Sequence, residues 1–370
     1  MLEKLLNTLD QLKASDLYIS VGLPPTVKLN GRLESLSDEN LASDDVYDLL
    51  ASTMDEDRMD EFKIKKEANF AIHLPDAGRF RISAFMQKDC PGMVVRRIQG
   101  KIPTFEELLL PEQLKEVCMA KRGLILFVGA TGSGKSTTQA AMIGFRNQHA
   151  SGHILTVEDP IEFVHEHARS VITQREVGLD TDSFEEALRN SLRQAPDVIV
   201  QGEIRTRETM QYALTFAETG HLCMATLHAN NANQALDRIL HLVPKETHRQ
   251  FLFDLSVNLK AIVAQQLIPT IDGKSSVAAF EIMFNTPTLA DLIRKGELHL
   301  LKDLMKDSGE HGMQTFDQAL FKLYANDSIG YTEALAHADS SNDLRLMIKL
   351  KASGGSAGLS SGMLNDVTVS

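Results

Sequence analysis

The stretch ILFVGATGSGKSTT, residues 125–138, decides the fold of this chain. An apolar run ends at Gly129, and the spacing Gly129–x4–Gly134–Lys135–Ser136 then fits the phosphate-binding loop (P-loop) pattern in full. Glycines at these positions let backbone N–H groups close around phosphate oxygens, where a Cβ would collide. The stretch therefore predicts a strand, a phosphate-binding turn and a helix, in that order.

The residue types of this loop have separate roles in binding a nucleotide. Lys135 brings a compact positive charge to the β- and γ-phosphates, and the hydroxyl of Ser136 can ligate Mg²⁺. The helix that we expect to begin near Lys135 adds its positive N-terminal dipole. The predicted nucleotide-binding residues are Gly129, Ala130, Thr131, Gly132, Ser133, Gly134, Lys135, Ser136 and Thr137.

Carboxylates follow two apolar segments downstream of the loop. DVIVQGEIR contains Glu203, and HILTVEDPIEF contains Glu158, Asp159 and Glu162. A P-loop enzyme needs such acids on neighbouring strands, to hold the water shell of the metal and to orient the attacking water. Acids at strand ends are also common helix caps, so we expect at least one member of the second group to be structural.

Two histidines flank another predicted strand in TGHLCMATLHANN, with His221 before it and His228 at its end. Together with Cys223 they suggest zinc, but alternate residues along a strand do not converge on one metal without further ligands. A hydrogen bond from His228 to the γ-phosphate or to a catalytic acid fits better. The plainer alternative is that each histidine is an ordinary core or surface residue.

The composition limits the compartment and the partners. A net charge of −12 repels polyanions, which argues against a nucleic-acid partner and against a nucleic-acid translocase on the same fold. The three cysteines are far apart and favour a reducing compartment. No signal-peptide core is present and no apolar stretch approaches the length of a membrane span. We therefore expect a cytoplasmic protein that does not cross a membrane.

Several classes of protein use a P-loop. A GTP switch needs an Asn-Lys-x-Asp string, and this chain has no Asn-Lys dipeptide. A small-molecule kinase is harder to exclude, although it rarely carries a separate α/β domain ahead of the loop, and no arginine-rich lid is visible. The class that remains is the RecA-like ATPase, with ATP and Mg²⁺ as cofactors and hydrolysis coupled to domain movement.

The sequence pattern changes near residue 123. Before it, an opening helix with periodic leucines, alternating strands and an Asn30–Gly31 turn predict a small α/β domain. After it, the apolar runs LILFVG, HILTVE, DVIVQG and HLCMATLH alternate with helical patterns, which predicts a largely parallel sheet flanked by helices. The predicted organisation is an α/β domain at 1–98, a linker at 99–122, an ATPase core at 123–285, a helical region at 286–351 and a disordered Gly/Ser-rich tail at 352–370.

Four motifs carry a resemblance to a known family. GATGSGKST, EDPIEF, QGEIR and TGHLCMATLHANN occur in the order found in secretion and type IV pilus ATPases, and FRISAF, VVRRI and GMQTFDQAL also match. Over residues 1–345 the chain resembles the type IV pilus retraction ATPases of the PilT/PilU family. The resemblance implies an α/β fold with an N-terminal PAS-like domain, a C-terminal RecA-like P-loop ATPase domain and extra C-terminal helices. It also implies a hexameric ring with ATP held between the two domains.

The resemblance implies roles for individual residues as well. Glu162 matches the catalytic glutamate of the aspartate box, which also contains Glu158 and Asp159, and Glu203 matches the Walker B glutamate that acts on the metal through water. The remaining matches are the two members of the histidine box and N-terminal arginines that reach the phosphates, namely His221, His228, Arg81 and Arg96, with Arg79 and Arg97 as neighbours.

The implied function is a motor that powers or assists pilus retraction in twitching motility. Its partners would be five further copies of itself, a PilT-like retraction ATPase and an inner-membrane platform protein, which places it peripherally at the pilus base. Gln201 departs from the family by putting a polar group in an apolar strand, and residues 288–292 lack the arginine of the family's Ala-Ile-Arg-Asn-Leu string. These departures favour the PilU-like branch. The alternative is a nucleotide-gated adaptor whose hydrolysis is dispensable and which strengthens a partner motor.

Overall fold

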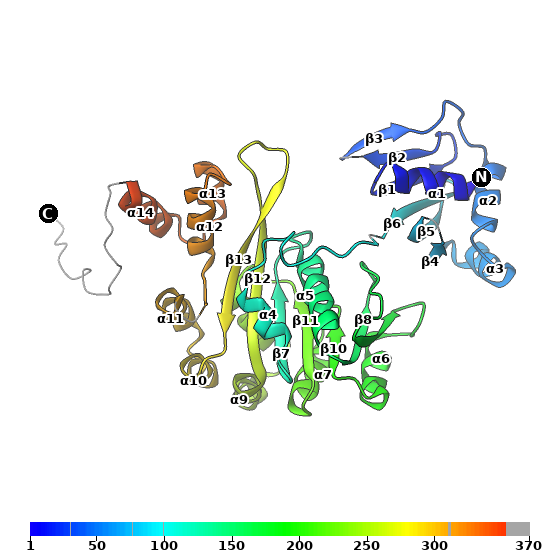
Figure 1. Ribbon diagram of the computed structural model, residues 1–370. Helices are drawn as coiled ribbons and strands as arrows, with labels where there is room; N and C mark the ends of the chain where they lie inside the picture. The colour runs from blue at the N-terminus through cyan, green and yellow to red at the C-terminus, as the bar shows by residue number, and fades with distance from the viewer. Residues whose placement is uncertain (30, 76, 99, 310–311, 353–370) are drawn as a thin grey trace. The chain divides into compact units, whose positions relative to one another are not determined.

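Two β-sheets organise the chain in the computed structural model, which describes residues 1–29, 31–75, 77–98, 100–309 and 312–352 (Figure 1). The chain divides into two compact units. The first comprises Met1–Gly123 and Ser136–Ala225, and the second comprises Leu124–Lys135 and the chain from Thr226 onward. The domain limits expected from the sequence stay predictions. Of the expected tail, Ala352 ends the last helix and the other residues lie outside the described ranges.

The first sheet has six strands in the order β3-β2-β1-β6-β5-β4, and the pairs between them are antiparallel. Leu29 pairs with Arg32, so β2 and β3 are antiparallel neighbours, as the Asn30–Gly31 signal predicts. The strands are β1 (Asp16–Ser20), β2 (Thr26–Leu29), β3 (Arg32–Ser35), β4 (Glu67–Leu74), β5 (Gly78–Gln87) and β6 (Cys90–Arg97).

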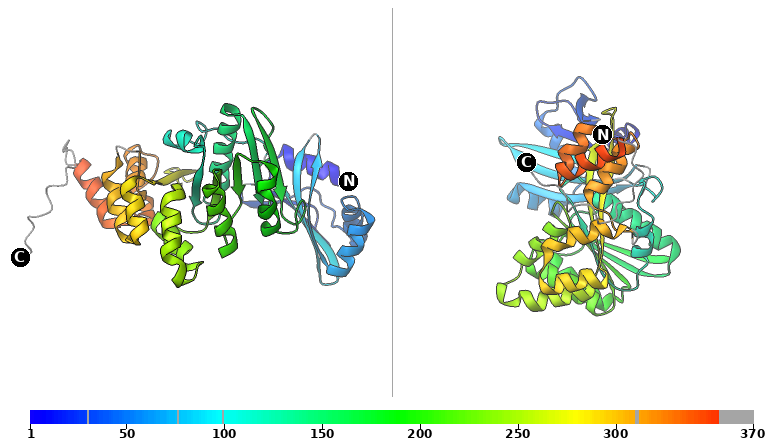
Figure 2. Two further views of the ribbon diagram at one scale, coloured as in Figure 1. Left: turned by 90° about the horizontal axis from the view of Figure 1, so that it is seen from below. Right: turned by 90° about the vertical axis from the view of Figure 1, so that its left-hand side faces the viewer.

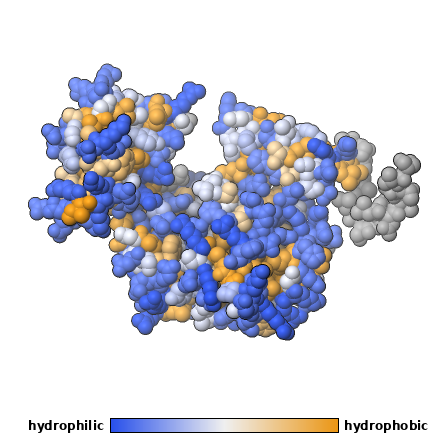
Figure 3. Space-filling view, turned by 180° about the vertical axis from the view of Figure 1, so that it is seen from behind, coloured by the Kyte–Doolittle hydropathy of each residue, from blue (hydrophilic) through white to orange (hydrophobic). Residues whose placement is uncertain are grey.

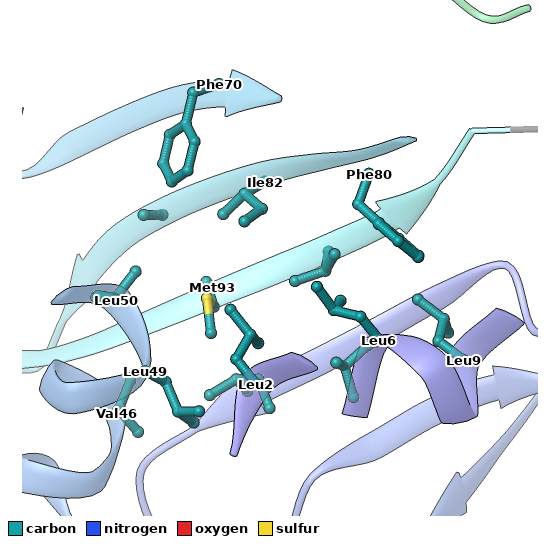
Figure 4. Close-up of a cluster of buried hydrophobic side chains, with 14 of the residues drawn as sticks. Leu2, Leu6, Leu9, Val46, Leu49, Leu50, Phe70, Phe80, Ile82 and Met93 are labelled. Atoms are coloured by element: carbon teal, nitrogen blue, oxygen red, sulfur yellow. The ribbon is translucent and has the colours of Figure 1, made fainter. Parts of the chain in front are cut away.

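Three helices, α1 (Leu2–Gln11), α2 (Ser43–Ala51) and α3 (Glu56–Lys65), accompany this sheet. Leucines at helical spacing on α1 are buried, which confirms the predicted opening helix. They pack with alternate residues of β5 and β6 in the core that Figure 4 shows, where Phe80 and Ile82 point toward α1. Burial of Phe80, Ile82 and Ala84 on one face of β5 leaves Arg79, Arg81 and Ser83 on the other face.

The second sheet has seven strands in the order β13-β12-β7-β11-β10-β8-β9. β9, β8, β10 and β11 pair in parallel, as do β7 and β12, whereas β13 is antiparallel to β12. This confirms the expected largely parallel sheet. The strands are β7 (Gly123–Val128), β8 (Gly152–Glu158), β9 (Ser170–Glu176), β10 (Val198–Gln201), β11 (Leu222–Leu227), β12 (Leu259–Pro269) and β13 (Ser276–Phe284).

The four apolar runs identified in the sequence correspond to β7, β8, β10 and β11. The apolar runs in the sequence do not predict the other three strands, β9, β12 and β13. Exposed and half-exposed residues separate the buried residues of β9, so the strand gives no continuous apolar run. β12 follows a helix directly, without a turn residue to separate the two patterns.

The helices after the first sheet begin and end where local chemistry favours it. Thr206 and Thr315 form capping boxes, and Thr286 caps a helix whose first residue is Pro287. They are α4 (Gln113–Cys118), α5 (Lys135–His149), α6 (Phe184–Ser191), α7 (Arg207–Glu218), α8 (Ala232–His241), α9 (His248–Asn258), α10 (Pro287–Lys295), α11 (Leu301–Asp307), α12 (Phe316–Ala325), α13 (Tyr331–His337) and α14 (Ser341–Ala352), with short 3-10 turns at Leu192–Gln194, Lys245–Thr247 and Leu298–Leu300.

The last helices form a group of their own. α12, α13 and α14 pack against one another, as Figure 2 shows in orange and red, and α12 also lies against β13. Within the described ranges, no helix combines the length and hydropathy that crossing a membrane requires. On the face seen in Figure 3, hydrophilic residues predominate and hydrophobic ones lie in separate patches.

The core of the first sheet gives a stability prediction. Phe80 is fully buried, so Phe80→Ala should lower the free energy of unfolding by about 3–5 kcal/mol through lost burial and the cavity it leaves. The control is Leu33→Ala, because Leu33 is 65% exposed, and its effect should stay within about 0.5 kcal/mol. Urea denaturation measures both variants, and equal effects would contradict this packing.

Candidate functional site

Backbone geometry explains why the P-loop needs glycine. Gly132 and Gly134 have φ values of +77° and +87°, a region that other residues avoid. A Cβ on Gly134 would lie 2.7 Å from Nε2 of Gln265, and one on Gly129 would lie 2.6 Å from the carbonyl oxygen of the same glutamine. Gln265 belongs to β12, the strand beside β7. The loop is therefore folded tightly against a neighbouring strand.

Lys135 begins α5, as the sequence predicted, and is buried. Its ammonium group donates to the carbonyl oxygens of Gly129 and Ala130, both at 2.8 Å. The side chain therefore points back into the first turn of the loop. Ala130, Thr131 and Gly132 are exposed at the tip.

Polar hydroxyls complete this segment. Ser133 is buried, and its Oγ has no hydrogen-bond partner in the described part of the chain. Ser136 and Thr137 are half-buried in the first turn of α5. Buried hydroxyls usually have a partner, so Ser133 is an exception in this segment.

The first acidic segment begins with Glu158, the last residue of β8, and its carboxylates differ in exposure. Glu158 is half-buried: its Oε1 accepts from Oγ1 of Thr156 at 2.6 Å and from Nε2 of Gln174 at 3.1 Å. Burial raises the pKa of Glu158, while these hydrogen bonds act in the opposite direction. Asp159 and Glu162 are exposed beyond it. The protein itself satisfies the first carboxylate and leaves the other two to solvent or a ligand.

The second acidic segment lies beside the first. The N–H of Gly202 donates to the carbonyl of Val157 at 2.8 Å, and a Cβ on Gly202 would lie 3.2 Å from Cα of Glu158. Glu203 follows at once, mostly buried, and forms an ion pair of 2.8 Å with Arg205. The structure therefore brings the ends of β8 and β10 together with their carboxylates.

Gln201, which departs from the family pattern, is fully buried at the end of β10. Its Nε2 donates to the carbonyl of Thr209 at 3.2 Å, and its Oε1 has no partner within the ranges described. The amide therefore fastens the end of β10 to the first turn of α7.

Sequence reasoning missed Glu176, at the end of β9. Its Oε2 accepts from the N–H of Ile161 and from Nη2 of Arg79, both at 3.3 Å. Burial raises the pKa of Glu176, while Ile161, Arg79 and Arg81 act in the opposite direction. This carboxylate ties the segment that carries Glu162 to an arginine of β5. Recognising β9 as a parallel strand would have pointed to it.

Strand register sorts the arginines of the first sheet. Arg81 pairs directly with Arg96 across β5 and β6, so both lie on one face, which Arg79 shares because it is two residues away. Arg96 donates to Asp16 at 2.9 Å. Arg97 lies on the opposite face, where it pairs with Asp10 of α1 at 3.0 Å. Three of the four arginines in the sequence motifs therefore lie on one face of the sheet, and Arg97 lies on the opposite face.

The two histidines lie at opposite ends of β11. His221 precedes the strand, and its Nδ1 lies 3.0 Å from Oγ1 of Thr219 and 3.2 Å from the carbonyl of Phe216, at the end of α7. His228 follows the strand. Cys223 is fully buried between them, and burial raises its pKa. No group of three potential metal ligands among His, Cys, Asp and Glu occurs in the described residues.

Known proteins share both the sequence and the fold of this chain. A family model described as type II/IV secretion system protein matches residues 26–304. The type IV pilus ATPase PilU of Pseudomonas aeruginosa is 59% identical over 348 residues, 94% of this chain and 91% of PilU. The type IV pilus retraction ATPase PilT of the same organism is 42% identical, over 87% of this chain and 93% of PilT.

A solved structure agrees with these relatives. The crystal structure of the pilus retraction motor PilT with bound ADP has a TM-score of 0.88 to this chain at 38% identity, covering 94% of this chain and 99% of the other. The resemblance found in the sequence is confirmed, and so is the mixed α/β fold with an N-terminal sheet domain, a C-terminal α/β domain and additional helices.

The close approach of Gln265 to Gly134 leads to a testable prediction about nucleotide binding. Gly134→Ala should weaken nucleotide binding at least tenfold, because the new Cβ meets Nε2 of Gln265 and the positive φ is strained. Gly22→Ala is the matched control, since Gly22 has a φ of +79° with nothing within 4 Å of its Cβ position. It should cost about 1 kcal/mol of stability and leave binding unchanged. Titration with a fluorescent nucleotide decides between them.

Proposed function

Because this chain belongs to the type II/IV secretion system protein family and has relatives among the type IV pilus ATPases, we propose that it is a hexameric ATPase motor that powers or assists pilus retraction. The observation that carries the proposal is the glycine-built loop that positions Lys135 at the start of α5. A loop of this geometry binds phosphates with backbone N–H groups and one ammonium.

Lys135 and the loop residues Gly129 to Thr137 would bind the β- and γ-phosphates of ATP. In the absence of phosphate, two carbonyl oxygens accept from the ammonium, and both are weaker acceptors than a charged phosphate oxygen. The exchange would move Lys135 little and needs no refolding of the loop. The resemblance of the chain to a motor with ADP bound in its crystal structure supports this use of the loop.

The oxygen donors of Ser136 and Glu203 are of the kind that Mg²⁺ prefers. Ser136 would hold the ion directly and Glu203 through water, since a hydroxyl in the first turn of α5 and a carboxylate at a strand end are the usual pair in P-loop enzymes. When bound, the ion neutralises charge on the phosphates. The pairing of Glu203 with Arg205 orients the carboxylate without the ion.

Glu162 is our candidate for orienting or deprotonating the attacking water. It is exposed, and it belongs to the same segment as Glu158, whose own carboxylate is satisfied by Thr156 and Gln174. Glu158 would then hold the segment in place, with Asp159 near the nucleotide. His228 would hydrogen-bond the γ-phosphate or a catalytic acid, and His221 remains a predicted nucleotide-binding residue at the other end of β11.

Arg81 and Arg96 would contact the phosphates from the N-terminal domain. Like charges directly across a strand pair repel, so two paired arginines on one face favour an anion between or beside them. An arginine from a separate domain contacts the nucleotide only while the two domains are closed. Hydrolysis and product release would then be converted into rotation of one domain against the other.

The setting of this motor follows from the pilus relatives. We propose that the chain acts peripherally at the inner-membrane base of the pilus, on a platform protein and beside a PilT-like retraction ATPase. The identity of 59% to PilU against 42% to PilT favours an accessory motor. An adaptor that binds nucleotide but does not need to hydrolyse it is the alternative.

Lys135→Ala tests the motor against the adaptor. The substitution should abolish phosphate release, because the ammonium is the main cation at the β- and γ-phosphates. Lys101→Ala, which breaks only an exposed pair with Glu107, should leave hydrolysis unchanged. In cells, pilus retraction is then measured with and without the partner retraction ATPase. Full retraction with the Lys135→Ala copy in both backgrounds would refute the motor.

The arginines provide a second test with a built-in control. Arg81→Ala and Arg96→Ala should each lower kcat about 1,000-fold, at the lower end of the range for arginine contacts to a transferring phosphoryl group. Arg97→Ala removes an arginine from the adjacent position on the other face, so it should cost about 1 kcal/mol of stability and less than a twofold change in kcat. Steady-state kinetics separates the three. A loss of kcat in Arg97→Ala equal to the others would remove the face argument.

A further inference from the structure

A buried carboxylate outside the motifs joins two helices. Glu281 lies on β13 and is 1% exposed. Its Oε1 accepts from the N–H of Ala232, the first residue of α8, at 2.8 Å, and its Oε2 accepts from the N–H of Phe316, the first residue of α12, at 3.4 Å. Each oxygen of this one carboxylate therefore serves a different helix.

The physical reason for this arrangement lies in the helix ends. The first N–H groups of a helix have no partner within it, and they carry the positive end of the helix dipole. Burial raises the pKa of Glu281 to about 7, whereas the two N–H groups and Lys302 act in the opposite direction. A buried carboxylate without such compensation would be costly, so its position is a specific feature of the fold.

A second set of contacts reinforces the same junction. Asn231 caps α8, and its Nδ2 donates to Asp339 at 3.2 Å. Asp339 also forms an ion pair with Lys302 of α11. Asp317 of α12, which is mostly buried, accepts from the N–H of Asp339 at 2.8 Å. The start of α8 is thus connected to α11, to α12 and to the turn before α14.

Strand register connects the junction to the P-loop. Glu281 pairs with Ala264 of β12, and Ala264 pairs with Val128, the last residue of β7 before Gly129. Two strand spacings, about 10 Å, therefore separate Glu281 from the start of the loop. A strand-to-strand connection of this kind is stiff, because backbone hydrogen bonds fix each neighbour.

The segment between His228 and Ala232 leads from β11 into α8. Its far end is held by Glu281 and by the Asn231–Asp339 contact, so a displacement of His228 is resisted at that end or transmitted to α12 and α14. We propose that Glu281 is a positioning residue: it fixes the His228 segment relative to the P-loop and couples its position to the C-terminal helices. The inference rests on the proposed role of His228 in hydrolysis.

The test uses the full chain and the substitution Glu281→Gln. Glutamine keeps the shape but has one acceptor oxygen, so only one of the two helix N–H groups can be satisfied. We expect kcat for ATP hydrolysis to fall about tenfold while KM changes less than twofold, because the P-loop itself is untouched. Asn231→Ser keeps the cap of α8 but loses the donor to Asp339, and it should lower kcat by a smaller factor with KM again unchanged.

Asn285→Ala is the matched structural control. Asn285 follows β13, and its side-chain amide donates to the carbonyls of Ser256 and Leu259, so its loss weakens the same region without touching α8 or α12. Its kcat should stay within twofold of wild type at temperatures below its own unfolding. A kcat loss in Glu281→Gln no larger than in this control would overturn the inference, as would an unchanged kcat in folded Glu281→Gln protein.

Hydrogen exchange gives a readout that separates this inference from the proposed function. Adding a non-hydrolysable ATP analogue to wild type should slow amide exchange at the first turns of both α8 and α12, whereas in Glu281→Gln the change should be confined to α8. If Glu281→Gln does not fold, exchange in wild type with and without the analogue still decides whether α8 and α12 are coupled. Wild type that binds the analogue but never hydrolyses ATP refutes the motor alone. Exchange at α12 that ignores the analogue in wild type refutes the coupling.

Discussion

The close approach of the P-loop to Gln265 is the constraint on which the rest of the structure depends. The loop can offer its backbone N–H groups to phosphates only if no side chain fills the turn, and Gly129 and Gly134 leave less than 3 Å for one. That geometry requires β7 to be buried beside β12, which explains the apolar run before the loop. The ammonium of the buried Lys135 then donates to the carbonyl oxygens of Gly129 and Ala130 within the loop.

Carboxylates in this chain are distinguished by what satisfies them. Hydroxyl and amide donors satisfy Glu158, an arginine pairs with Glu203, and helix N–H groups satisfy Glu281. Each of these groups has a fixed position because a buried charge needs defined partners. Glu162 differs, since it is exposed beside them. We interpret the carboxylates with fixed partners as groups that hold the structure in place, and we propose Glu162 as the carboxylate available for chemistry.

The arginines of the first sheet also differ in what surrounds them. Strand alternation and the pairing of Arg81 with Arg96 place these two on the face away from the hydrophobic core, whereas Arg97 turns toward α1 and Asp10. Glu176 adds a link that no motif reveals, from Arg79 to the backbone of the acidic segment. An anion that competed with Glu176 for Arg79 would therefore also affect the segment that carries Glu162.

The sequence alone determined the P-loop, the strand before it, the helix after it, the largely parallel sheet and the family, because glycine spacing and apolar periodicity are local properties. It also named Glu162, Glu203 and His228 as candidates, whose roles stay predictions. Only the tertiary structure decided that Arg97 and Arg81 lie on opposite faces of the first sheet. It also decided that Glu176 and Glu281 each bridge two segments of the chain, and that β9, β12 and β13 complete the second sheet. The reason is physical: register and long-range hydrogen bonds join residues far apart in the chain, and no local pattern encodes which of them meet.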